Sequence, residues 1–133
     1  MSGLWLSHHG PEHLDRCVSI AGRPVCRRCL ALWPLTYGLL AAQILLRAPG
    51  HSPWDVLLPL ALTPAVLDFV IVHARRRPYD ARRVWLLQPL LALGLARLFF
   101  RYMVSPGDPV NWIVGAMVVG PCAWAMWRFH RRG

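Results

Sequence analysis

The sequence lacks lysine altogether and is poor in acidic residues, so its basic character comes from arginine alone. Fifteen arginines face six acidic residues and give a formal net charge of +9, yet only 16% of the chain is charged. Four cysteines in 133 residues are too few for a small disulfide-stapled scaffold. The length excludes a large multidomain enzyme, and a hydrophobic content of 56% excludes an intrinsically disordered chain.

Charge is nearly absent from four long stretches, and these stretches predict membrane-spanning helices. Each has 17 to 20 residues and at most two charges; they cover residues 30–46, 54–73, 84–100 and 110–127. A helix needs roughly 20 apolar residues to cross a hydrocarbon core. None of the stretches has the polar stripe that a soluble helical bundle would need. We therefore predict an all-α polytopic membrane protein with four transmembrane helices, consisting of a short N-terminal segment (residues 1–29) and a membrane domain (residues 30–133).

The arginines are distributed unevenly around these helices. With four crossings, twelve of the fifteen fall on one side of the bilayer, Arg47 and Arg101 fall on the other, and Arg97 lies within the third helix. Because basic residues stay on the cytoplasmic side in short loops, we expect a protein of the cytoplasmic (inner) membrane with both termini in the cytoplasm. The positive charge then requires no nucleic-acid partner. One basic cluster is suited to anionic lipid head groups: Arg75, Arg76, Arg77, Arg82 and Arg83.

The N-terminal segment concentrates side chains that bind metals. Three histidines and three cysteines lie within 22 residues, namely His8, His9, His13, Cys17, Cys26 and Cys29. Cys26 and Cys29 have the C-x2-C spacing that lets two thiolates hold one metal ion, and cytoplasmic thiols remain reduced. Cys17 and one histidine would complete a tetrahedral site for zinc, with an iron–sulfur cluster as the alternative. A redox-active Cys26–Cys29 dithiol is a further alternative.

The same stretch resembles a known family. The residues that carry the resemblance are His8-His9, Arg16-Cys17, Gly22, and Val25-Cys26-Arg27-Arg28-Cys29, which run into a helix containing Tyr37 and Gly38. They are similar to the DUF2085 family of small predicted bacterial integral membrane proteins, over the N-terminal third of the chain. The later helices fit in number, and Asp68 provides the acidic residue of the second one. The resemblance implies a small membrane protein with a Cys/His motif and no established activity.

Two charges lie inside the predicted helices, where each costs roughly 2.5–3.5 kcal/mol at the bilayer centre. Asp68 is near the cytoplasmic end of the second helix and Arg97 is deep in the third. A depth difference of about 12 Å, at 1.5 Å per residue, argues against a direct ion pair. We expect Arg97 to reach the outer surface near Arg101. We expect Asp68 either to hydrogen-bond a metal ligand or to bind an arginine of residues 75–83.

These features favour a structural or accessory role, in which zinc ties the N-terminal segment to the helices and an unidentified protein is the partner. An enzyme is less favoured, because no nucleophile–base pair lies outside the cysteine cluster. A membrane redox protein or thiol enzyme is the main alternative. A metal-ion transporter is a weaker one, because it needs polar residues along a path across the bilayer. The chain offers few of them: Thr36, Gln43, Thr63, Asp68, Gln88, Arg97 and Asn111.

Overall fold

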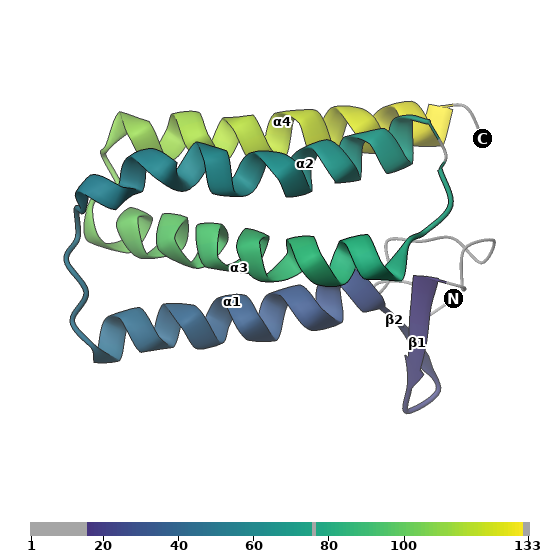
Figure 1. The fold of residues 1–133 in the computed structure, drawn as a ribbon, viewed down its shortest axis with the longest axis horizontal. Helices are drawn as coiled ribbons and strands as arrows, with labels where there is room; N and C mark the ends of the chain where they lie inside the picture. The colour runs from purple at the N-terminus through teal and green to yellow at the C-terminus, as the bar shows by residue number, and fades with distance from the viewer. Residues whose placement is uncertain (1–15, 76, 132–133) are drawn as a thin grey trace.

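Four long helices run alternately in opposite directions (Figure 1). The computed structural model describes residues 16–75 and 77–131. The helices are α1 (Arg27–Leu45), α2 (Leu58–Ala74), α3 (Ala81–Val104) and α4 (Pro109–Arg131), with a short 3₁₀ helix, η2 (Pro53–Leu57), leading into α2. Each of the four, α2 together with η2, is long and apolar enough to cross a membrane. The predicted set of four membrane-length helices is confirmed, with ends that differ by a few residues.

The order of the helices in space differs from their order in the sequence. α1 packs chiefly against α3, α3 also packs against α2, and α2 packs against α4. Figure 1 shows the consequence, with α3 lying between α1 and α2. Because the chain alternates direction, α1 and α3 run parallel and both begin at the same end of the bundle. Residues far apart in the sequence are thereby brought together at each end.

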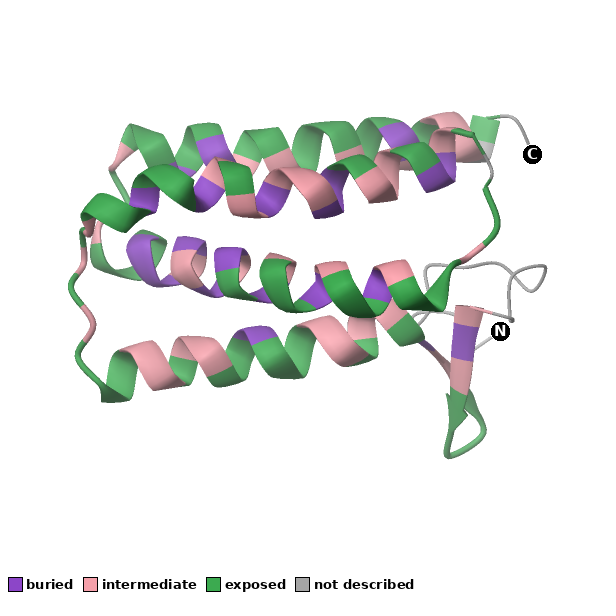
Figure 2. Cartoon of the chain, in the orientation of Figure 1, coloured by how far each residue is buried: buried purple, intermediate pink, exposed green. Residues whose placement is uncertain are grey.

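The interior is small and lies mainly between α2, α3 and α4. Leu62, Leu98 and Val114 form its central cluster. Close packing of α3 against α2 depends on Gly94, since a Cβ there would lie 2.6 Å from Cδ2 of Leu62. In α1, by contrast, Thr36 is the only buried residue. Figure 2 shows the buried positions concentrated on the inner helices, which leaves a largely apolar outer surface of the kind that lipid covers.

Before α1 the chain forms a β-hairpin that the sequence analysis did not predict. Strands β1 (Cys17–Ile20) and β2 (Arg23–Cys26) pair antiparallel. Ala21 and Gly22 form the turn, with φ values of 51° and 75°, as a two-residue hairpin turn of type I′ requires. The expected purely helical fold is therefore corrected by one short sheet. In addition, α1 begins at Arg27, so Cys29 belongs to its first turn and not to the segment before it.

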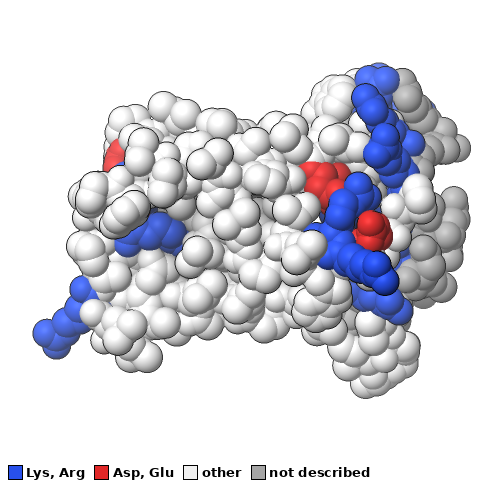
Figure 3. Space-filling model, viewed as in Figure 1, with Lys and Arg blue, Asp and Glu red and all other residues white. Residues whose placement is uncertain are grey.

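The two ends of the bundle carry the charge. We call the end with β1, β2 and the start of α1 the hairpin end, and the end with residues 46–57 and 105–108 the distal end. On the face shown in Figure 3, charged atoms gather at both ends and uncharged side chains cover the middle. Several tryptophans are exposed by 46% to 75%, a position suited to the headgroup layers: Trp54, Trp85, Trp112, Trp124 and Trp127.

Candidate functional site

Three of the predicted metal ligands meet where the hairpin joins α1. Cys17 lies directly opposite Cys26 in the hairpin register, so their side chains project from the same face of the ladder. Both are buried, at 8% and 1% exposure. Cys29 follows in the first turn of α1, and its thiol is within hydrogen-bonding contact of Cys26. The hairpin, which the sequence did not reveal, is what brings Cys17 to the C-x2-C pair.

The remaining predicted ligands, His8, His9 and His13, lie outside the described residues. Within residues 16–75 and 77–131, no group of three His, Cys, Asp or Glu side chains is arranged to hold a metal ion. The thiols therefore share one junction without forming a closed ligand set by themselves. Thiolates combined with an imidazole are the donors that zinc prefers, so the zinc site stays a prediction that needs a histidine from the N-terminal segment.

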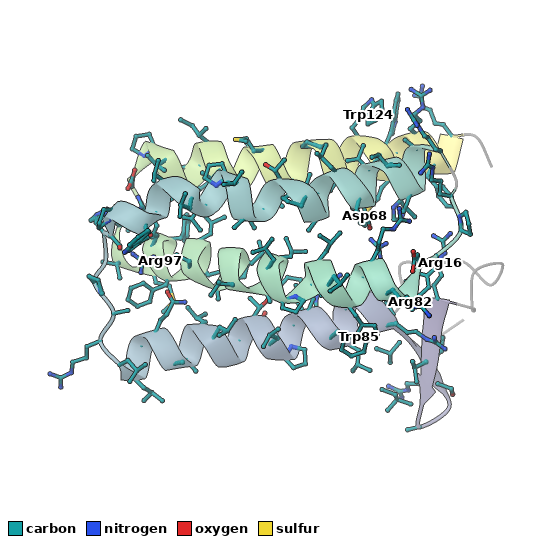
Figure 4. The ribbon with its side chains drawn as sticks, in the orientation of Figure 1. Arg16, Asp68, Arg82, Trp85, Arg97 and Trp124 are labelled. Atoms are coloured by element: carbon teal, nitrogen blue, oxygen red, sulfur yellow. The ribbon has the colours of Figure 1, made fainter. Side chains whose placement is uncertain are left out.

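Asp68, on α2, contacts arginines near the starts of α1 and α3. Its carboxylate accepts a hydrogen bond from Nη2 of Arg28 at 3.2 Å and lies 3.5 Å from Nε of Arg83. The Arg28 guanidinium also lies 5.9 Å from the ring centres of both Phe69 and Tyr79. The expected bond from Asp68 to an arginine of residues 75–83 is thus observed, through Arg83. Arg28, which the sequence analysis did not consider as a partner, adds α1 to the same contact (Figure 4 labels Asp68).

The distal end contains a buried ionic cluster that the sequence analysis missed. At its centre is Arg101, which is 5% exposed. Its guanidinium donates hydrogen bonds to Oδ1 of Asn111 at 3.0 Å, to Oδ2 of Asp108 at 2.6 Å and to Oδ2 of Asp55. These partners come from α4, from the turn before α4 and from η2. Arg101 was expected in a loop on the outer surface, but α3 continues to Val104 and carries Arg101 into the bundle.

Arg97 lies one turn earlier on α3 and binds the same carboxylate. Its Nε and Nη2 donate to the two oxygens of Asp55 at 2.7 and 3.0 Å. Nη1 and Nη2 also donate to the carbonyl oxygens of Pro49 and Gly50 at 2.9 and 3.4 Å. The predicted absence of a direct Asp68–Arg97 pair is confirmed. Arg97 reaches toward the distal surface as expected (Figure 4). Its hydrogen bonds connect α3 to η2 and to the loop before η2.

The distal cluster is electrically balanced and fully hydrogen-bonded. Two guanidinium groups face the two carboxylates of Asp55 and Asp108, and Asp55 also accepts the backbone N–H of Ser52 at 2.9 Å. Asp108 accepts the N–H of Val110 at 2.9 Å, which caps the start of α4. A closed network of this kind fixes helices in place and leaves no group to react. Two arginines four residues apart on α3 were the signal in the sequence, but their partners are 7, 10 and more than 40 residues away.

Unsatisfied polar atoms gather at the hairpin end instead. Among the described residues, the buried side-chain atoms without a hydrogen-bond partner are Nε of Arg16, Arg83 and Arg128, Oε1 of Gln88 and Oγ1 of Thr36. Three of these five residues lie at the hairpin end, Arg16 before β1, Arg83 near the start of α3 and Arg128 near the end of α4, whereas Thr36 and Gln88 lie farther inside α1 and α3. An unsatisfied buried polar group costs about 1–3 kcal/mol, so the polar groups at this end are less completely paired than those of the distal cluster.

Comparison of the chain with protein-family models, with curated proteins and with solved structures gives no match. The resemblance of the N-terminal third to the DUF2085 family therefore stays a prediction. Function has to be inferred from the contacts of this chain alone.

Proposed function

We propose that this chain is a small multi-pass protein of the inner membrane whose hairpin end holds a structural zinc ion on the cytoplasmic side. Cys17, Cys26 and Cys29 supply three thiolates, and one of the N-terminal histidines (His8, His9 or His13) supplies the fourth ligand. Zinc held in this way ties the N-terminal segment to α1 and presents it to a protein partner. The role is one of assembly or interaction, with no reaction assigned to the site.

One observation carries this proposal, the alignment of Cys17 with Cys26 across the hairpin next to Cys29. The two-stranded ribbon sets Cys17 opposite Cys26, and Cys29 follows in the first turn of α1, so the three thiols lie on neighbouring elements at one junction. Zinc binding would draw these thiols and a histidine together. A fourth ligand closes a tetrahedral site, and closed four-ligand sites are structural because catalytic zinc keeps an open position. Three thiolates and Zn²⁺ carry a net charge of about −1, and the adjacent Arg27 compensates it, since Arg28 is paired with Asp68.

The test is the metal content of the purified full-length protein and of single cysteine variants. We expect about one zinc per chain in the wild type and no visible absorption bands. Cys17→Ser, Cys26→Ser and Cys29→Ser should each lose most of the zinc. Cys122→Ser is the matched control, because the fourth cysteine lies in α4, far from the hairpin, and should retain it. Full zinc content in Cys17→Ser would contradict the three-thiolate site.

A redox dithiol is the second candidate, and the contact between the Cys26 and Cys29 thiols favours it. It predicts no bound metal and a reversible Cys26–Cys29 disulfide, measured by mass spectrometry after thiol alkylation. Visible charge-transfer bands would instead indicate an iron–sulfur cluster. The three outcomes are mutually distinguishable on one preparation.

The membrane orientation rests on the arginine distribution and has its own test. The hairpin and the end of α4 lie at the same end of the bundle, as an even number of crossings requires (Figure 1). Basic residues are concentrated there, which supports a cytoplasmic position for this end. A fluorescent-protein fusion to the C-terminus should therefore fluoresce in the cytoplasm, and an alkaline phosphatase fusion at the same point should be inactive. The reverse result would invert the topology and remove the reducing environment that the zinc site needs.

A further inference from the structure

A cavity near the distal end separates α1 from α2, the two helices on either side of α3 (Figure 1). It has a volume of about 490 Å³, and its walls come from α1, the loop after α1, η2, α2 and α3. Both α1 and α2 pack against α3, but in the described part of the chain they make almost no contact with each other. These helices are long and apolar enough to span a membrane, so the molecules that can enter the gap from the side are lipids.

The lining of this cavity changes from polar to apolar with increasing depth in the bundle. Gln43 lies two residues before the end of α1, and the guanidinium of Arg97 reaches the carbonyl oxygen of Pro49 in the loop beyond it (Figure 4). Leu93 and Gly94 lie ten or more residues before the end of α3, about 15 Å below it at 1.5 Å per residue. The polar groups are therefore nearer the headgroup layer and the apolar wall is nearer the bilayer centre, which is the order of the esters and acyl chains of a lipid.

The polar part of the cavity has hydrogen-bond donors that the described residues do not use. Nε2 of Gln43 and Nη1 of Arg97 each carry two N–H groups. Each nitrogen donates one hydrogen bond, Gln43 to the carbonyl oxygen of Leu39 at 3.3 Å and Arg97 to that of Pro49 at 2.9 Å. The charge of Arg97 is already balanced by Asp55. The cavity therefore favours a neutral acceptor, such as a carbonyl oxygen, over an anion.

We propose that the cavity holds one diacyl glycerophospholipid of the leaflet that surrounds the distal end. An ester carbonyl accepts hydrogen bonds from Gln43 and Arg97, and the attached acyl chain runs along α3 past Gly94 toward the bilayer centre. Trp54, which is 75% exposed and lines the same cavity, lies at the level of the headgroups. The lipid fills the gap between α1 and α2 and completes the packing of α1, in which Thr36 is the only buried residue. This inference depends neither on the zinc site nor on which end of the bundle is cytoplasmic.

The test is a lipid titration of the full-length protein in detergent, freed of co-purified lipid and followed by native mass spectrometry. Three probes separate the ester from the headgroup: dioleoylphosphatidylcholine, its dioleyl ether analogue, which lacks both carbonyls, and dioleoylphosphatidylglycerol. We expect one molecule of the diester phosphatidylcholine to bind about tenfold more tightly than the diether. Phosphatidylglycerol should bind as well as the diester phosphatidylcholine, because the charges at the site are balanced. Equal binding of diester and diether, or a tenfold preference for the anionic lipid, would overturn the proposal.

Matched variants locate the lipid. Ala61→Leu places a larger side chain in the cavity and should weaken binding of both phosphatidylcholines about tenfold. Ala116→Leu makes the same change on the exposed face of α4, outside the cavity, and should leave binding unchanged.

Gln43→Met removes an amide donor and tests the contact with the ester. It should weaken binding of the diester several-fold and leave binding of the diether unchanged, a difference that a general loss of structure would not produce. If Ala61→Leu does not fold, Gln43→Met decides alone, because Gln43 is partly exposed near the end of α1. Undiminished binding in both variants would place the lipid elsewhere and reject this cavity.

Discussion

The two ends of the bundle differ in how their charges are satisfied. At the distal end, Arg97 and Arg101 share Asp55, and Asp108 completes a balanced cluster in which the polar groups are paired. At the hairpin end, Asp68, whose side chain is 11% exposed, contacts Arg28 and Arg83 at 3.2 and 3.5 Å. Of the other basic residues described there, Arg16 donates to the carbonyl oxygen of Arg77 at 3.5 Å, and Arg128 and Arg131 lie over tryptophan rings.

This difference separates what holds the helices together from what is left for a ligand. The distal cluster joins η2, α3 and α4 through bonds between residues far apart in the sequence, so it fixes the arrangement of the helices. The charged groups of the distal cluster are already paired with one another. The hairpin end has the thiols, a cavity beside Gln88 and most of the unsatisfied polar atoms. We infer that stability is concentrated at the distal end and metal binding at the hairpin end.

The largest expected effect is that of Asp55→Asn. The substitution removes the carboxylate that Arg97 and the buried Arg101 share and leaves Asp108 as the one carboxylate for two guanidinium groups. Breaking a buried pair in this way costs about 3–5 kcal/mol. Tryptophan fluorescence during denaturant unfolding in detergent micelles would measure it. Arg47→Gln, at an exposed distal position, is the control and should change stability by less than about 0.5 kcal/mol. An effect of Asp55→Asn no larger than that of the control would remove the distinction between the two ends.

A pair of conservative substitutions distinguishes the two arginines. Arg101→Lys keeps the charge but loses the planar group that binds Asp55, Asp108 and Asn111 together, so we expect a loss of about 2–3 kcal/mol. Arg97→Lys should cost less, about 1–2 kcal/mol, because Arg97 is 15% exposed and water can replace part of its bonding. The same unfolding assay measures both. The reverse order would mean that the loop contacts of Arg97, and not the bridge to α4, hold the distal end.

The helices were predictable because hydrophobicity is a local signal. Long uncharged runs mark membrane-length helices wherever their partners lie, and the prolines within them, such as Pro34 and Pro64, did not end these helices. The hairpin was not predictable in the same way. Its strands have only four residues each, and β2 contains Pro24, which ordinarily argues against a strand. The order of the helices, with α3 between α1 and α2, depends on side-chain packing that one sequence does not display.

The candidate site shows the same difference between local features, which were predictable, and long-range contacts, which were not. The C-x2-C pair was visible from spacing, but only the hairpin register shows that Cys17 faces Cys26. The distal cluster was missed because Asp55 is the second residue of the stretch 54–73, which was predicted as a helix, and Arg101 was expected outside the helices. Pairing across more than 40 residues leaves no periodic trace in a single chain. The sequence therefore located the candidate ligands better than it located the contacts that stabilise the fold.

Asp68→Asn tests the weaker ionic contact at the hairpin end. Both Asp68 and Arg28 are mostly buried, but Arg83 is 42% exposed and its distance is long, so we expect a loss of about 1–2 kcal/mol. The same sample should be measured for zinc. Reduced zinc content in a folded Asp68→Asn protein would show that the carboxylate also supports the metal site. A stability loss equal to that of Asp55→Asn would show that both ends contribute equally to the fold.

The smallest effects come from two glycines, one at each end, and they act for different physical reasons. Gly22 has φ +75° and open space around it, so Gly22→Ala strains the turn of the hairpin by about 1 kcal/mol. Gly50 lies in the distal loop, where an added Cβ would lie 2.8 Å from Cγ1 of Val104. Val104 is 52% exposed and can move, so Gly50→Ala should cost less than about 1 kcal/mol.

The two glycine variants should also differ in the reactivity of the thiols. A hairpin destabilised by 1 kcal/mol opens about fivefold more often, and opening exposes Cys17 and Cys26, which are otherwise buried. The rate of maleimide alkylation in metal-free protein should therefore rise about fivefold in Gly22→Ala and remain unchanged in Gly50→Ala. Acceleration in both variants would mean that the two ends open together as one cooperative unit. The stabilising end and the binding end would then differ in the chemistry of their side chains but not in how often they open.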